Sequence, residues 1–278
     1  MIKKIRLAEI LLMTGFVLIA LPFLPVETLS SGHVARNSSL LFLANFLLLV
    51  AVYSANSFFG YKADRLNPRL RDHQFSSPRK YQVVTLVSLA TALGLLSTLN
   101  RDLPYLGILS FLLWVFYSAP GGAKSRPYLG TLVHLVGQVL QFHLCIVAFA
   151  PPTLSTLAVS IYFGLLFASG HLMHEVKDHE SDAAAGIRTN AVVFGTARLI
   201  AFYRLAVALI PVYWLLLFCA GLLNAEQFWP FFVASGAHLA LTLFSPLSPG
   251  GERFQAAYRV LYFAAGVVTF ATSPGWAV

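Results

Sequence analysis

Long apolar stretches follow one another along the whole chain and are separated by short polar segments. Each stretch is close to the roughly 20 residues that a helix needs to cross a bilayer. The stretches are continuous and do not alternate between apolar and polar residues as the strands of a membrane β-barrel would, which disfavours strands. The pattern therefore predicts an all-α polytopic membrane protein with a bundle of nine transmembrane helices. The predicted spans are Leu7–Leu24, Leu40–Phe59, Tyr81–Leu99, Leu103–Ala119, Tyr128–Ala150, Leu154–His174, Leu199–Leu223, Phe228–Phe244 and Phe254–Thr272.

The composition agrees with a membrane environment. Of the 278 residues, 58% are hydrophobic and 11% are charged, whereas soluble domains are about 25% charged. The net charge of +8 is spread among apolar runs and does not form the basic surface stripe of a nucleic-acid-binding protein. Cys145 and Cys219 lie in apolar runs and behave as small hydrophobic residues. No linker rich in Pro, Gly or Ser divides the chain, so we expect residues 1–278 to form a single integral membrane domain.

The basic residues predict the orientation. With nine spans, the N-terminus and the loops after the even-numbered spans lie on one face of the membrane. Every Lys and Arg except Arg36 and Arg101 falls on that face. Such a bias marks the cytoplasmic side, so we expect a multi-pass protein of the inner (cytoplasmic) membrane with a cytoplasmic N-terminus. The first apolar stretch is long for a signal peptide, and we expect it to be retained as a helix.

A polar segment at the end of the sixth apolar stretch carries three carboxylates. Glu175, Asp178 and Asp182 are spaced i, i+3 and i+7, so on a helix they share one face. Charges in a bilayer need a partner or a polar cavity, and clustered oxygen ligands suit Mg²⁺ completed by water and phosphate. The alternative is a solvated helix end in which Lys177 and Arg188 balance the acids.

A second polar segment follows the second apolar stretch. Asn56, Gly60 and Asp64 are spaced i, i+4 and i+8 and place one amide and one carboxylate on a shared helical face. The alternative is a polar helix end closed by Pro68. Both segments fall on the predicted cytoplasmic face.

Other chemistries have little support in the sequence. No nucleophile elbow, Walker loop or dinucleotide-binding glycine pattern occurs, and His174-Glu175 lacks the second histidine of a zinc protease. We interpret the isolated histidines as hydrogen-bonded residues of the helix interior; they are His134, His143, His171 and His238.

The two polar segments resemble the motifs of the UbiA superfamily of intramembrane prenyltransferases, which have nine helices and an acidic motif after helices two and six. The first motif usually reads Asn-Asp-x-x-Asp-x-x-x-Asp. Asn56 and Asp64 match it, while Ser57 and Gly60 replace its middle acids. The usual basic segment after this motif is not present, and Arg71 is a nearby substitute.

The second motif usually reads Asp-x-x-Asp-x-x-x-Asp, followed by Gly and Thr. Glu175, Asp178 and Asp182 match it, with Gly186 and Thr189 at the expected places. Between the two motifs, the stretch from Tyr117 to Pro120 that leads to Lys124 and Arg126 is similar to the Tyr-Ser-x-Pro loop of the family. The resemblance covers the whole chain in topology and three loops in residues.

The resemblance implies a Mg²⁺-dependent enzyme that ionises an isoprenyl diphosphate and transfers the prenyl group to an aromatic or other lipophilic acceptor. The implied catalytic residues are Asn56, Asp64, Asp178 and Asp182. The implied metal ligands are Asn56, Asp64, Glu175, Asp178 and Asp182. The implied substrate-binding residues are Arg71, Tyr117, Lys124, Arg126 and Lys177.

Two alternatives remain open. The Asn-x-x-x-Gly-x-x-x-Asp form of the first motif resembles terpene-cyclising members of the superfamily, which would cyclise the isoprenyl diphosphate without an acceptor. A non-enzymatic transporter could instead use the acids to bind ions, although transporters place such groups near the membrane midplane.

Overall fold

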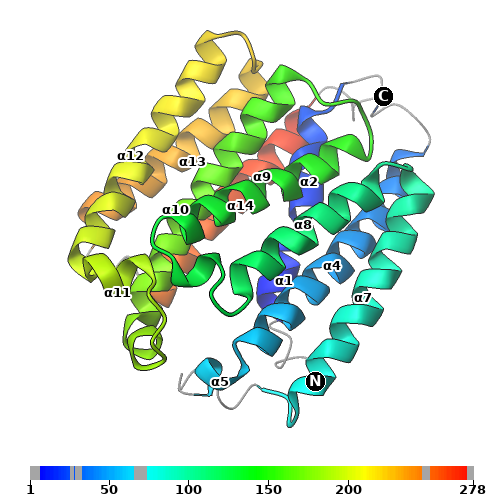
Figure 1. Cartoon of the computed structure of the whole chain (residues 1–278). Coiled ribbons are helices and arrows are strands. Elements are labelled where there is room, and N and C mark those ends of the chain that lie inside the picture. Colours follow the sequence, from blue (N-terminus) through cyan, green and yellow to red (C-terminus); the bar gives the residue numbers. More distant parts are fainter. Residues whose placement is uncertain (1–6, 26–27, 29–32, 66–73, 246–250, 274–278) are drawn as a thin grey trace.

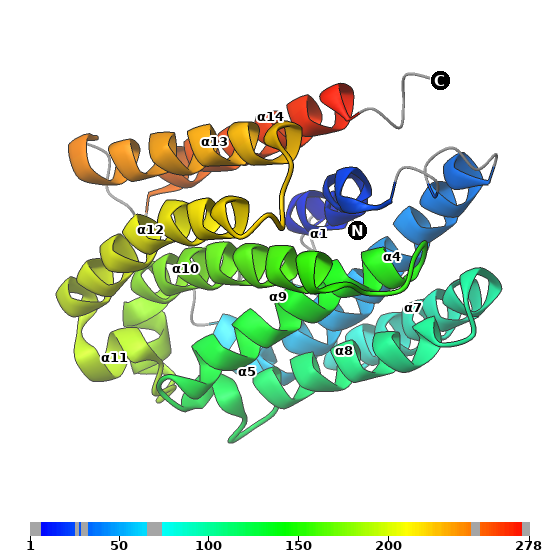
Figure 2. The ribbon, with the colours of Figure 1, turned by 90° about the horizontal axis from the view of Figure 1, so that it is seen from above.

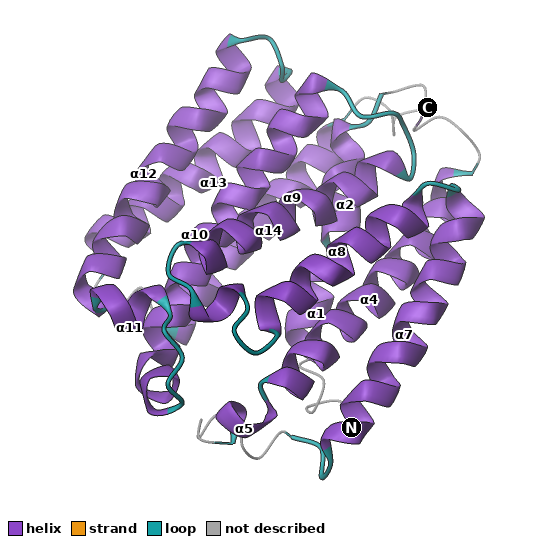
Figure 3. Ribbon diagram, in the orientation of Figure 1, coloured by secondary structure: helices purple, strands orange, loops and turns teal. Residues whose placement is uncertain are grey.

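The protein is helical throughout the residues that its computed structural model describes, which are 7–25, 28, 33–65, 74–245 and 251–273. No strand occurs within them (Figure 3). The elements are α1 (Leu7–Thr14), α2 (Phe16–Ala20), the 3₁₀ helix η2 (Leu21–Phe23), α4 (Val34–Phe59), α5 (Tyr61–Asp64), α7 (Pro78–Leu99), α8 (Leu103–Ser118), the 3₁₀ helix η3 (Ala123–Ser125), α9 (Leu129–Val147), α10 (Leu154–Ala184), α11 (Asn190–Phe194), α12 (Thr196–Cys219), α13 (Ala225–Phe244) and α14 (Glu252–Thr272).

The long helices form a ring in which neighbours in space are neighbours in sequence. α4 packs on α7, and the series continues through α8, α9, α10, α12, α13 and α14 (Figures 1 and 2). The short helices α1 and α2 close the ring: α2 contacts α14, and α1 and α2 each contact α4. Figure 2 shows α13 and α14 on one side of the bundle and α7 and α8 on the opposite side.

The outer surface of the ring is apolar. Large hydrophobic side chains are exposed at helical spacing, for example Val83, Leu86 and Val87 on α7 and Leu205 and Leu209 on α12. A soluble protein rarely exposes such a continuous apolar surface. Seven of the described helices are also long and apolar enough to cross a bilayer. The chain is therefore an integral, multi-pass membrane protein.

The predicted count of nine membrane-spanning helices is not confirmed. The first apolar stretch is interrupted at Gly15 and continues as α2 and η2. Glycine weakens a helix at this point, and the amide groups of Leu18 and Ile19 both bond to the Gly15 carbonyl, at 3.0 and 3.2 Å. The eighth predicted span is α13, which packs between α12 and α14 but is not among the seven.

An aromatic cluster anchors the interrupted first stretch within the ring. The ring of Phe23 lies 6.0–6.4 Å from the rings of Phe142, Phe163, Trp214 and Phe231, which belong to four different helices. Aromatic pairs at these separations stabilise a buried core. Short helices that could not span the bilayer alone are thus held in place by packing.

Helix α10 is longer than its apolar stretch. The prediction ended the sixth span at His174, but α10 has 31 residues and continues to Ala184. At 1.5 Å per residue it is about 46 Å long, which exceeds the roughly 30 Å hydrocarbon core. Its last turns therefore carry the acidic segment beyond the apolar region, and this segment is helical as predicted.

Candidate functional site

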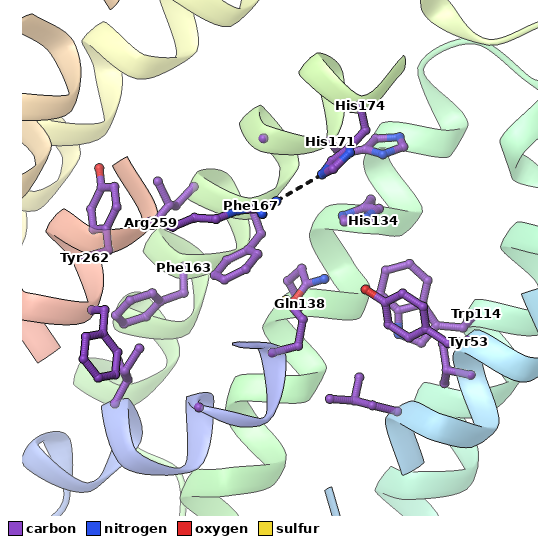
Figure 4. A pocket seen from close by; sticks show the side chains of 18 of the residues that line it. Tyr53, Trp114, His134, Gln138, Phe163, Phe167, His171, His174, Arg259 and Tyr262 are labelled. Carbon is purple, nitrogen blue, oxygen red and sulfur yellow. Dashed lines mark hydrogen bonds between the residues drawn. The ribbon is translucent and has the colours of Figure 1, made fainter. Parts of the chain in front are cut away.

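A cavity of about 420 Å³ lies inside the ring of helices. Its walls come from α1, α2, α4, α8, η3, α9, α10 and α14 (Figure 4). One part of its lining is apolar and includes Met13, Ile19, Phe163 and Phe270. The cavity is therefore amphipathic, with an apolar part and a polar part.

The polar part is built by helix ends that meet at one end of the bundle. Asn56 precedes the end of α4 by three residues, and Asp178 lies near the end of α10. Lys124 lies between α8 and α9, and Arg259 lies near the start of α14. Because successive helices run in opposite directions, these positions converge at one end, where Figure 1 also shows α5 and α11. The structure thus brings the two polar segments of the sequence to one cavity.

A tight glycine turn places Lys124 in the cavity wall. Gly121 has φ +69°, and a Cβ at Gly122 would lie 2.1 Å from the Phe116 carbonyl oxygen. Only glycine fits so close to another backbone segment. The turn carries Lys124 Nζ to 3.6 Å from Asp182 Oδ1, and the Asp182 side chain is only 8% exposed. This ion pair connects the α8–α9 loop to the end of α10.

Glu175 faces α11 rather than the cavity. Its carboxylate accepts hydrogen bonds from Asn190 Nδ2 at 3.1 Å and from the Ala191 amide at 3.4 Å. It also lies 3.1 Å from His171 Nε2, one turn earlier on α10. Glu175 is buried, so the Asn190 and Ala191 donors compensate a charge that would otherwise be costly inside the protein. Its two oxygens hold neighbouring elements together.

Asn190 extends this network to the start of α9. Its Oδ1 accepts a hydrogen bond from the Tyr128 amide at 2.7 Å, and its Nδ2 donates to Thr131 Oγ1 at 3.0 Å. Tyr128 has φ +63°, a strained value for a residue with a side chain. The network therefore fixes the segment that joins the Lys124 turn to α9.

The sequence-predicted site residues divide into four groups. Asn56, Tyr117, Lys124 and Asp178 line the cavity. Glu175 and Asp182 are buried behind its wall. The remaining described ones do not line it: Asp64 ends α5, Lys177 is half-buried on α10 and Arg126 is exposed. Arg71 lies outside the described residues.

The oxygen-bearing side chains in the cavity suit a metal ion whose coordination is completed by water or by a phosphate ligand. Within the described residues, no three His, Cys, Asp or Glu side chains are grouped closely enough to hold an ion by themselves. Asp178 and Asn56, which both carry side-chain oxygens, nevertheless line one cavity. Mg²⁺ commonly uses one or two carboxylates and completes its shell with water and phosphate oxygens. The arrangement is thus suited to a magnesium–phosphate ligand.

Two histidines that the sequence assigns to the helix interior lie in the cavity wall. His134 and His171 stack with ring centroids 4.2 Å apart and an interplanar angle of 13°, and the rings of Trp114 and Tyr117 meet His134 edge-on. Both histidines line the cavity (Figure 4). His134 Nδ1 has no hydrogen-bond partner among the described residues. Nε2 of His171 likewise has no hydrogen-bond partner among the described residues, so the prediction of hydrogen-bonded interior histidines is not confirmed for His134 and His171.

The same prediction holds for His238. Its Nε2 lies 2.7 Å from the Tyr203 hydroxyl and its Nδ1 lies 3.3 Å from the Tyr262 hydroxyl. His238 is 1% exposed and links α12, α13 and α14. This histidine is part of the helix packing.

Comparisons with known proteins agree with this architecture. The model of the UbiA prenyltransferase family matches residues 11–271. No curated protein sequence is significantly similar to the chain. A UbiA homolog from Archaeoglobus fulgidus bound to DMAPP and Mg²⁺ has a TM-score of 0.70 at 18% identity, over 98% of this chain and 99% of that chain.

Two further solved structures share the fold. A UbiA homolog from Aeropyrum pernix K1 has a TM-score of 0.70 at 15% identity, over 95% of this chain and 96% of that chain. Digeranylgeranylglyceryl phosphate synthase has a TM-score of 0.67 at 14% identity, over 98% of this chain and 96% of that chain. The family match covers nearly the whole sequence, and the ring of helices is shared across all three structures. The chain belongs to the UbiA prenyltransferase family.

Proposed function

We propose that this protein is a Mg²⁺-dependent intramembrane prenyltransferase, which ionises an isoprenyl diphosphate and transfers the prenyl group to an aromatic or other lipophilic acceptor. The observation that carries the proposal is the amphipathic cavity, where Asn56, Lys124 and Asp178 line one part and apolar side chains line the other. Such a cavity matches a substrate with a charged head and a hydrocarbon tail. The Archaeoglobus fulgidus homologs bound to DMAPP or GPP with Mg²⁺ support the same substrate class.

In the proposed reaction, the allylic C–O bond of the diphosphate breaks heterolytically, and its electron pair leaves with the diphosphate oxygen. Mg²⁺, when bound, supplies electrostatic stabilisation of the leaving oxygens. Asp178 and Asn56 would provide oxygen ligands for the ion. The Lys124 ammonium contributes positive charge for the phosphate oxygens, and its pairing with Asp182 fixes its position before the charge develops.

The remaining prenyl cation lies in the apolar part of the cavity. Aromatic side chains line this region, among them Phe163 and Phe270, and the negative face of a ring attracts a cation. The apolar wall also excludes water, which would otherwise capture the cation. The acceptor then forms the new bond to the prenyl carbon and loses a proton, which restores its neutrality.

The other predicted site residues have proposed supporting roles. Glu175 positions α11 through its hydrogen bonds with Asn190 and Ala191. Asp64, Arg126 and Lys177 belong to segments at the end of the bundle that carries the polar part of the cavity, and we propose that they act on the head group from that side. We also propose that this end faces the cytoplasm, because it carries most of the basic residues.

A product analysis tests the proposal. Purified protein in nanodiscs is given geranyl, farnesyl or geranylgeranyl diphosphate with Mg²⁺, with and without aromatic acceptors. We expect diphosphate release and a prenylated acceptor. The pattern formed by Asn56, Gly60 and Asp64 favours cyclisation as the second candidate, which would give a cyclic hydrocarbon or alcohol without acceptor. If the protein releases diphosphate from none of the three substrates, the proposed enzymatic function is overturned.

A further inference from the structure

Arg259 is a cation in the cavity wall that the motif-based prediction did not assign. It lies seven residues after the start of α14, or about 10 Å along the helix. Its side chain is half-buried and lines the cavity. The residues that follow it to the end of the helix carry no charge.

The ion pairs within 4 Å in the described part of the chain do not include Arg259, whose side chain is hydrogen-bonded to Tyr258. The Nη2 of Arg259 also donates a hydrogen bond to His174 Nε2 at 3.4 Å (Figure 4). A charged residue within a membrane helix is costly and usually marks a functional site. An anionic ligand in the cavity would compensate this charge.

Arg259 faces the cavity from a different wall than Lys124. Lys124 belongs to η3, which packs on α8 and α9, whereas α14 packs on α13 and α2. Figure 2 shows α14 and α8 on opposite sides of the bundle. The Lys124 charge is partly balanced by Asp182, so one cation alone offers limited compensation for a diphosphate. Arg259 would add a second cation from the other side.

We infer that Arg259 is a substrate-binding residue that holds phosphate oxygens of the diphosphate across the cavity from Lys124, with His174 positioning its guanidinium. The inference rests on the proposed function, since it assigns a residue to the head group of the proposed substrate. A guanidinium presents paired N–H donors that match two phosphate oxygens. It would keep the released diphosphate bound while the carbon–oxygen bond is broken and negative charge grows on the leaving group.

The experiment measures binding without turnover. Calorimetry of the full-length protein in nanodiscs gives the dissociation constant for inorganic pyrophosphate with Mg²⁺. We expect R259Q to weaken binding about 10-fold or more, as expected for the loss of charge-assisted hydrogen bonds. R259K retains the positive charge but loses the paired N–H donors of the guanidinium, so we expect an intermediate affinity for pyrophosphate. R253Q is the matched control, because Arg253 is exposed on the same helix and does not line the cavity.

The outcomes separate this inference from the proposed function. If the wild type binds pyrophosphate and both Arg259 variants bind it equally well, the inference is overturned while the proposed function stands. If the wild type releases no diphosphate from any isoprenyl substrate, the proposed function itself fails. If R259Q does not fold, R259M takes its place, because it also removes the charge, and an unchanged affinity in that variant would equally overturn the inference.

Discussion

Lys124 Nζ and Asp182 Oδ1 lie 3.6 Å apart, and the carboxylate is nearly buried while the lysine side chain is 32% exposed. Lys124 lines the cavity, whereas Asp182 lies behind it. The aspartate therefore compensates and orients a cation that the substrate would meet. Removal of either partner should leave the other in an unfavourable environment.

We expect D182N to lower the free energy of unfolding by about 1–3 kcal/mol, because the lysine loses its charge partner and the buried site loses a charge-assisted contact. Thermal unfolding in detergent measures the change. D102N is the control, since Arg101 and Asp102 are 3.9 Å apart with side chains 94% and 66% exposed, and exposed pairs contribute little. Equal unfolding midpoints for D182N and D102N would contradict the role of the buried pair.

We expect D178N to reduce diphosphate release by at least about 100-fold while leaving the fold intact, because the amide keeps the size of the side chain but removes a charged oxygen ligand. Release from geranyl diphosphate with Mg²⁺ is the measurement. E180Q should retain wild-type turnover, since Glu180 is exposed on the same helix. Normal turnover in D178N would exclude Asp178 from the site.

We expect E175Q to lower the free energy of unfolding by about 1–2 kcal/mol, since an amide nitrogen would replace an oxygen that accepts a hydrogen bond from Asn190 or Ala191. A purely positioning role predicts an unchanged half-saturating Mg²⁺ concentration. A rise of 10-fold or more in that concentration would instead support the sequence-based prediction that Glu175 is a metal ligand.

We expect G137A to distort the cavity wall. A Cβ at Gly137 would lie 2.7 Å from Trp114 Cζ2, so the indole must move away from its place against His134. Overpacking of this kind typically costs about 1–3 kcal/mol, and tryptophan fluorescence should change with it. G94A is the control: a Cβ there meets nothing within 4 Å, and its unfolding midpoint should be unchanged or higher. Identical emission spectra for G137A and wild type would rule out the displacement.

Much of the fold could be predicted because the bilayer imposes a simple rule on helix length and hydropathy. The long helices appeared where the apolar stretches lie, and the acidic segment of α10 is helical as its spacing indicated. The interruption at Gly15 could not be read from hydropathy, since the apolar residues continue on both sides. It depends on packing, through Phe23 and the aromatic side chains of four other helices.

The candidate site was only partly predictable. Asn56 and Asp178 stand in recognisable motifs, and both line the cavity. His134 and Arg259 belong to no recognisable motif. Their place in the site depends on residues distant in sequence: His134 stacks on His171, and Arg259 is hydrogen-bonded to His174. An ionisable residue within an apolar helix was the available signal, but one sequence does not show which other helix it faces.

The closure of the helix ring by α1 and α2 bears on how the protein is made. These short helices are synthesised before α14, yet α14 is one of their neighbours in the fold. A chain that lacks α14 would lack the part of the cavity wall that contains Tyr258, Arg259 and Tyr262. The cavity is therefore complete only after α14 has entered the membrane and packed against α2.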